Sequence, residues 1–294
     1  MKKMFAGLVA LTIIAGSCKK QDSETGTSPL TAERETPVTE ACGSKYLNLV
    51  IDAAGGGQSY LYRVDNSPSN PPVLVSFIGQ IGNVTFMTGI SYDPASGVGF
   101  GVTGNAGSNP NSLVKFDVNI PSNFGVTPLL ATFPINLSDI ERNPWNGRYY
   151  AINRAVANNN SLVIVDINTG VVTQLPSSTG QPLRGLAMDP GGKIYVMRTV
   201  AGGNGRVSVI DPTTGAVIPP FNQCPYPGVI SPGGLANAEM GLHFDDICTN
   251  LLVTGNFTGT NIQLTDGYPA CLGPAAYTAL PNSLRPTVDF SRLY

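Results

Sequence analysis

Four side chains in this sequence carry oxygen atoms suited to a hard divalent cation. Asp139, Glu141 and Asn143 alternate along one short segment, and Glu239 stands just before a similar segment later in the chain. A cation of this class takes six or more oxygen ligands, including water. The four residues therefore form a candidate metal site if the fold brings them together.

The same carboxylates have a second interpretation, which needs no metal. Asp139, Arg184, Glu239 and Arg285 each stand near the beginning of a different predicted strand. The four are therefore candidates to form ion pairs that line a ligand-binding channel mouth. We favour this interpretation, because structural ion pairs are common and perturb a site without catalysing a reaction. The expectation is thus no cofactor, with a divalent cation as the alternative.

His243 is the only histidine of the chain. It lies in the segment GLHFDD, where alternation places Leu242 and Phe244 on one side and His243 on the other. A histidine at such a position is a candidate general base. Without an orienting partner in the sequence, we expect it to be a hydrogen-bonded structural residue.

The elements that must position these residues are short strands in a repeat. Residues 185–218 divide into four strands, LAMD, KIYVMRT, RVSVID and AVI, joined by the turns DPGG, AGGNG and PTTG. Proline presets the backbone and glycine takes positive φ in such turns. The pattern recurs at a spacing of about 50 residues, which is typical of four-stranded propeller blades. The third strand of each copy ends at Asp65, Asp117, Asp166, Asp211 and Asp266.

The order of strands at the two ends predicts how the ring closes. The first ordered segment, YLNLVID, is a second strand with no first strand before it, and the chain ends with the first-type strand TVDFSRLY. Pairing of the two would complete one blade and leave no open edge. The sequence therefore predicts an all-β propeller of five four-stranded blades. Six blades are the alternative if residues 221–238 contain further strands.

The segments Tyr195-Val196, 207–211 and 214–217 resemble the YVTN-type propeller repeat, and residues 149–153 with 162–172 resemble a second copy. This resemblance extends over most of residues 45–294 and implies the fold, while propellers carry many functions. By residue type alone, Asp139, Asn143 and Glu239 are similar to the cation ligands of gluconolactonase-type propellers. That likeness implies a metal-dependent lactonase or lyase as the alternative activity.

The turns and loops differ in the chemistry they offer. We expect the repeated Asp residues to cap their turns by accepting backbone N–H groups two residues on. Trp145, in a first-to-second turn, is expected to pack. The loops on the other face, 53–58, 104–112, 154–160 and 219–238, are rich in Asn, Gly and Ser and offer uncharged hydrogen bonds. Binding residues are often carried by such loops.

Four of the five cysteines are candidates for disulfides. Cys42, Cys224, Cys248 and Cys271 lack CxxC spacing, which argues against zinc. Their even number permits three pairings. We expect Cys248 to pair with Cys271, because both fall in turns on the same face of the last blade.

The N-terminal segment MKKMFAGLVALTIIAGSC has a charged start, a short apolar stretch and small residues directly before Cys18. It resembles the lipobox of bacterial lipoproteins, as in the Bacteroidota. The resemblance implies a signal peptide at residues 1–17 and lipidation of Cys18 with acyl chains such as palmitate. Residues 18–44, rich in Ser, Thr, Glu and Pro, are then a flexible tether, and residues 45–294 form the propeller domain.

Composition limits the functional classes. The formal net charge is −2, charged residues are 12% of the chain, and no basic stripe indicates a nucleic-acid partner. The sequence also contains no nucleophile motif, zinc cluster or phosphate loop. We therefore predict a non-catalytic binding or scaffolding lipoprotein, anchored to the outer membrane of the cell envelope, whose loops bind a protein, peptide or glycan.

Overall fold

The computed structural model describes residues 45–52, 56–65, 74–155, 161–199, 205–219, 224–225, 240–245, 250–255, 263–266, 276–279 and 287–292. Contacts divide the chain into Met1–Val38 and Thr39–Tyr294, and all described residues belong to the second unit. Every regular element among them is a β-strand. These residues form no helix long and apolar enough to cross a bilayer.

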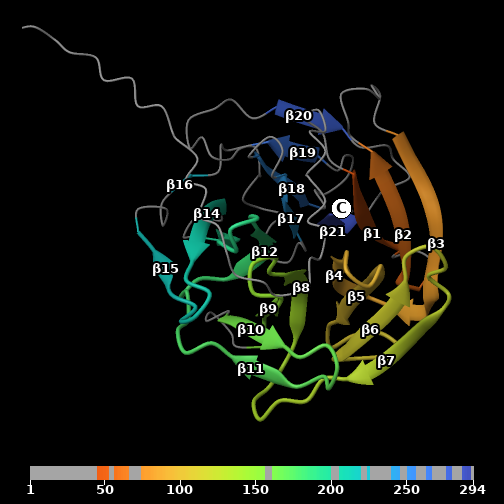
Figure 1. Ribbon diagram of the computed structural model, residues 1–294, viewed down its shortest axis with the longest axis horizontal. Coiled ribbons are helices and arrows are strands. Elements are labelled where there is room, and N and C mark those ends of the chain that lie inside the picture. The colour runs from red at the N-terminus through yellow and green to blue at the C-terminus, as the bar shows by residue number, and fades with distance from the viewer. Residues whose placement is uncertain are drawn as a thin grey trace, which may run out of the picture. The chain divides into compact units, whose positions relative to one another are not determined.

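The strands form five antiparallel sheets (Figure 1). Within each sheet, the strands are named below from the centre outward. The first sheet contains β21 (Thr287–Arg292), β1 (Lys45–Asp52), β2 (Gln58–Asp65) and β3 (Leu74–Thr85). The second contains β4 (Met87–Asp93), β5 (Val98–Thr103), β6 (Ser112–Asp117) and β7 (Phe124–Pro128). The third contains β8 (Leu137–Arg142), β9 (Tyr149–Asn153), β10 (Ser161–Val165) and β11 (Val172–Gln174).

The last two sheets follow the same pattern. The fourth contains β12 (Leu183–Met188), β13 (Ile194–Thr199), β14 (Gly205–Ile210) and β15 (Val217–Ile218). The fifth contains β17 (Met240–Asp245), β18 (Asn250–Gly255), β19 (Gln263–Asp266) and β20 (Ala276–Ala279). The short β16 (Cys224–Pro225) pairs with β14 and thus joins the fourth sheet. Within residues 221–238, where the six-blade alternative needs further strands, residues 224–225 extend the fourth sheet, while 221–223 and 226–238 lie outside the described residues.

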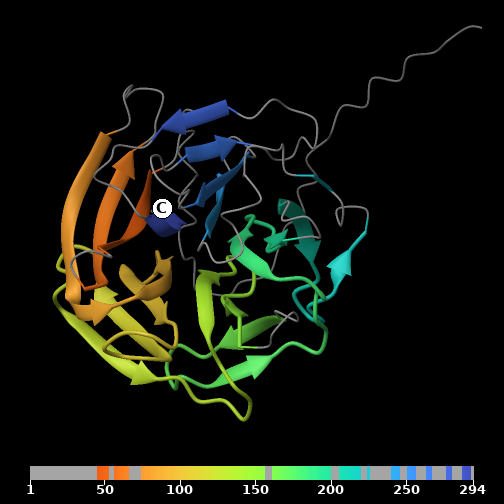
Figure 2. The ribbon, with the colours of Figure 1, turned by 180° about the vertical axis from the view of Figure 1, so that it is seen from behind.

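The innermost strands are neighbours around a central axis. β4 contacts β21 and β8, and β12 contacts β8 and β17, while β17 contacts β21. Figures 1 and 2 show the five sheets radiating from these strands. The chain is an all-β propeller, as the sequence predicted. The C-terminal β21 pairs with the N-terminal β1, for example Tyr46 with Arg292, and this pairing is consistent with the predicted five-blade closure.

Apolar side chains fill the spaces between neighbouring sheets. Leu47, Leu61 and Ile81 of the first sheet pack against Ile90 and Phe116 of the second. Equivalent clusters join the second sheet to the third, around Phe100 and Tyr149, and the third to the fourth, around Ile152 and Leu186. Strands buried on both faces explain the nearly continuous apolar runs of the repeat.

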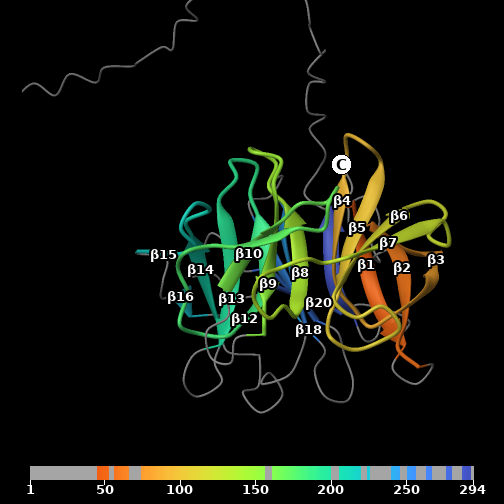
Figure 3. The ribbon, with the colours of Figure 1, turned by 90° about the horizontal axis from the view of Figure 1, so that it is seen from below.

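The connections gather at two ends of the sheets (Figure 3). We call the end with the first-to-second and third-to-fourth connections the turn face, and the opposite end the loop face. On the turn face, four carboxylates accept the N–H two residues on: Asp93 from Ala95, Asp117 from Asn119, Asp166 from Asn168 and Asp211 from Thr213. The predicted capping role is confirmed at these positions. The hydrogen bonds from Asn168 and Thr169 lower the pKa of Asp166.

Four of the innermost strands carry an irregularity at the same place. The pairing register shifts near Thr88 in β4, Asp139 in β8, Arg184 in β12 and Val288 in β21. An extra residue of this kind bends a strand and redirects its side chains. The bulges therefore decide where the polar residues next to the axis point.

Candidate functional site

Asp139 lies in the bulge of β8 and is only 2% exposed. Its backbone has φ of 54°, a left-handed conformation that Asp tolerates better than most residues. The side-chain Oδ2 accepts a hydrogen bond of 2.6 Å from the backbone N–H of Leu186 in β12, the innermost strand of the next sheet. Asp139 therefore links two sheets of the propeller.

The innermost strands repeat this kind of link around the axis. Oδ2 of Asp289 accepts the N–H of Ile90 at 2.7 Å, and Oγ of Ser291 accepts the N–H of Tyr92 at 2.6 Å. Oγ of Ser91 accepts the N–H of Arg142 at 3.0 Å. Each acceptor belongs to one sheet and each donor to the next. Buried backbone N–H groups on these strand edges are thus satisfied by side chains.

A glycine, Gly89, occupies the position in β4 that faces Asp139 of β8. A Cβ on Gly89 of β4 would lie 2.6 Å from the backbone N of Asp139. Only a residue without a side chain permits this approach of two innermost strands. In β12, Gly185 directly precedes the Leu186 N–H that Asp139 binds.

Glu141 lies two residues after Asp139 on β8 and is partly buried. Its pKa is raised well above the usual value, first by burial and then by the nearby charge of Asp139, while a hydrogen bond with Ser91 acts in the opposite direction. A carboxyl in these surroundings is poorly suited to remain charged without a compensating cation.

Asn143 stabilises a turn at the turn face and does not take part in the links at the axis. Its Oδ1 accepts the N–H groups of Trp145 and Asn146, and its Nδ2 donates to the carbonyl of Gly192 in the next sheet. Both ends of the amide are therefore used by the protein. Among the residues that the structure describes, no three His, Cys, Asp or Glu side chains are close enough to hold a metal ion.

The remaining predicted site residues are placed only in part. Arg184 is buried in the bulge of β12, where it interacts with other groups of the protein. His243 lies in β17, where it pairs in register with Leu252. Of the four candidate cation ligands, Asp139 and Glu141 lie close enough for the charge of Asp139 to raise the pKa of Glu141. Outside the described residues lie Cys18, Glu239, Cys248, Cys271 and Arg285.

Trp145 corrects one expectation. The sequence predicted a packing role, but the side chain is 75% exposed on the turn face. The turn holds its backbone through Asn143, and the Cβ atom of Trp145 lies against Gly192, where an added Cβ would be 2.7 Å away. The turn chemistry was readable from the sequence, whereas the exposure of the indole depends on the neighbouring sheet.

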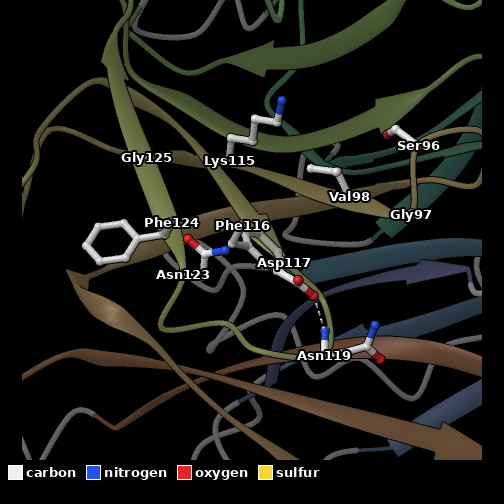
Figure 4. A pocket seen from close by; sticks show the side chains of 10 residues that line it. All are labelled: Ser96, Gly97, Val98, Lys115, Phe116, Asp117, Asn119, Asn123, Phe124 and Gly125. Atoms are coloured by element: carbon white, nitrogen blue, oxygen red, sulfur yellow. Dashed lines mark hydrogen bonds between the residues drawn. The ribbon is translucent and has the colours of Figure 1, made fainter.

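A cavity of about 610 Å³ opens on the outer part of the second sheet at the turn face (Figure 4). Lys115 and Asp117 are the charged side chains in its lining. The Lys115 Nζ lies 6.0 Å from the centre of the Phe100 ring, and the Asp117 carboxylate accepts the N–H of Asn119. Both charged groups thus have contacts within their own sheet. A second, more apolar cavity of about 750 Å³ lies where Leu130 and Val171 bridge two sheets.

The loop face carries the residue that sequence reasoning missed, Phe86. Its φ is 54°, its ring is 38% exposed, and its N–H donates to the carbonyl of Gly57 at 2.8 Å. The 104–112 loop lies beside it: the N–H of Ser108 donates to Oγ1 of Thr85 at 2.8 Å. No local sequence signal predicts positive φ for a phenylalanine.

No family model and no curated protein matches the chain. Among solved structures, the chain is similar to TolB from Acinetobacter baumannii at 14% identity and a TM-score of 0.46, over 76% of this chain and 48% of that one. It therefore spans about half of that TolB chain.

Two further solved structures are similar to most of the chain. The Cps50 (Swd1) β-propeller domain of Myceliophteria thermophila matches at 15% identity and a TM-score of 0.39, over 79% of this chain and 73% of that one. Virginiamycin B lyase from Staphylococcus aureus matches at 10% identity and 0.40, over 81% and 71%. Such distant likenesses carry no information on activity.

Proposed function

We propose that the protein is a β-propeller lipoprotein of the cell envelope and acts as a non-catalytic binding module through its loop face. The observation that carries this proposal is the hydrogen bond between Asp139 and the Leu186 N–H. Asp139 was a candidate cation ligand and a candidate ligand-binding residue at the channel mouth. Its use as a buried link between sheets favours a structural role for the axis and leaves recognition to the loops.

The anchoring part of the proposal rests on the sequence around Cys18 and on the direction of β1. Lys45 begins β1 and pairs with Asp65, where β2 ends at the turn face. Lys45, the first described residue, therefore lies at the turn face, opposite the loops. This position supports recognition through the loop face.

The alternative, a metal-dependent lactonase or lyase, predicts a cation bound by Asp139, Glu141, Asn143 and Glu239. A thermal melt of the full chain tests it, first in EDTA and then with Ca²⁺, Mg²⁺, Mn²⁺ or Zn²⁺. A ligand that binds only the folded state raises the melting temperature. We expect no shift. A rise that Asp139→Asn abolishes would instead favour the metalloenzyme.

The binding role is tested by crosslinking in cells. A photoreactive amino acid is placed at Asn105, exposed on the loop face, and in a matched variant at Asn168, exposed on the turn face. We expect covalent adducts from position 105 and none from position 168. Adducts from position 168 alone, or from neither position, would contradict recognition by the loop face.

A further inference from the structure

Phe86 has a strained backbone that the fold maintains. A bulky residue with φ of 54° is an outlier, because the left-handed conformation brings Cβ too close to the following carbonyl oxygen. Hydrogen bonds on both sides hold the segment: the Phe86 N–H donates to Gly57, and the Met87 N–H donates to Oγ of Ser59 at 3.2 Å. Strain of this kind concentrates at functional sites.

Core packing does not account for the strain. Phe86 is 38% exposed, and one edge of its ring lies over Gly57, where an added Cβ would be 2.7 Å from the ring carbon Cδ2. Gly57 itself has φ of 82°. The glycine therefore provides both the backbone conformation and the space that keep the ring at the surface of the loop face.

The neighbouring 104–112 loop is ordered against the same segment. Oγ of Ser108 donates to the carbonyl of Asn83 at 3.0 Å, and an added Cβ on Gly107 would lie 2.6 Å from the carbonyl oxygen of Thr85. At the other end of the loop, the Asn105 N–H donates to Oδ1 of Asn136 at 3.3 Å. A loop ordered in advance loses little entropy on binding.

Three segments in this part of the loop face are polar and uncharged. Segments 83–86, 104–112 and 129–136 contain no Asp, Glu, Lys or Arg. The 104–112 loop offers the exposed amide of Asn105, while the hydroxyl of Ser108 already bonds Asn83 and Thr85. An aromatic face packs against C–H groups, and amides and hydroxyls bond hydroxyl groups. A neutral sugar ring presents both kinds of group.

We propose that the loop face binds a neutral carbohydrate, with Phe86 as the ring on which one sugar stacks. This inference rests on the proposed binding function and specifies its ligand class. A charged ligand would find no counter-charge on the three segments. A protein partner is the other outcome that the experiments distinguish.

The test uses the full chain in a detergent without a sugar head group. Isothermal titration calorimetry measures binding of neutral hexasaccharides of glucose in α-1,4 and β-1,4 linkage, of β-1,4-mannose, of β-1,4-xylose and of N-acetylglucosamine. We expect at least one of them to bind, and Phe86→Ala to weaken its affinity about tenfold. Phe86→Tyr keeps the aromatic face and is expected to retain binding.

Two controls keep the result specific. Phe77→Ala removes a ring that is 59% exposed on β3 and packs beside Tyr62, and it should leave affinity unchanged. Phe86→Gly removes the ring and also relieves the strained backbone. If this variant melts like the wild type, a loss of affinity comes from the missing ring and not from unfolding. Wild-type affinity in Phe86→Gly would overturn the inference.

The failures of the two proposals are distinguishable. Binding of none of the five sugars, together with protein adducts at position 105, overturns the carbohydrate inference and leaves the binding module standing. Absence of both sugar binding and adducts overturns both proposals.

Discussion

The link between Asp139 and Leu186 makes a quantitative prediction. Asp139→Ala removes the acceptor and leaves the Leu186 N–H buried without it, since Asp139 is 2% exposed and Leu186 is fully buried. Loss of a hydrogen bond to a charged group costs about 1.5–3 kcal/mol. Alanine also tolerates φ of 54° less well than aspartate. Together these effects predict a loss of about 2–4 kcal/mol in the free energy of unfolding.

Urea unfolding at neutral pH, followed by circular dichroism, measures this loss by linear extrapolation. Asp139→Asn keeps an oxygen acceptor and tolerates the same backbone conformation, so we expect it to recover most of the stability. Asp166→Ala is the matched control, because its carboxylate bonds Asn168 and Thr169 in an exposed turn where water replaces it. Equal stability of Asp139→Ala and the wild type, within about 0.5 kcal/mol, would refute the structural role of this carboxylate.

Five more variants extend the reasoning. Gly89→Ala places a Cβ against the Asp139 backbone and should destabilise by about 1–3 kcal/mol in urea unfolding, whereas Gly97→Asn, at φ of 68° in open space, should be tolerated. The folded-state pKa of Glu141 is raised, so charging it at neutral pH opposes folding. Glu141→Gln should therefore be more stable than the wild type at pH 7, and this advantage should disappear below the unfolded pKa of about 4.3; a less stable variant at pH 7 would contradict the burial argument. The buried Tyr149 hydroxyl finds no hydrogen-bond partner among the described residues, so Tyr149→Phe should melt at or above the wild-type temperature. Cys18→Ala should release the protein from the membrane fraction, and its retention there would disprove lipidation.

The axis of this propeller shows why a ligand prediction based on residue type is incomplete. Asp139 lies in the bulge of β8 and Asp289 directly follows the bulge of β21, and each bonds a backbone N–H of the next sheet. A conventional strand ladder would satisfy those N–H groups with carbonyls. In this propeller the innermost strands of neighbouring sheets are joined by side chains, so acidic residues at the axis have a structural use that requires no ligand.

Features that depend on neighbours along the chain follow from residue order alone. Apolar alternation and Asp-Pro-Gly turns predicted the strands β12 to β15 and the capping by Asp93, Asp117 and Asp211, since each capping bond spans two residues. The phase of the repeat predicted the pairing of the last strand with the first. Turn chemistry and side-chain alternation are local, and local rules can be read from residue order.

The roles of the candidate site residues come instead from contacts between sheets. Asp139 meets its partner from another sheet at Leu186, and Phe86 receives its conformation from Gly57 and the 104–112 loop. Trp145 is exposed although its turn was predictable. These outcomes depend on how sheets pack around the axis and where each bulge turns a side chain. Such contacts join residues far apart in the chain, so no local pattern records them.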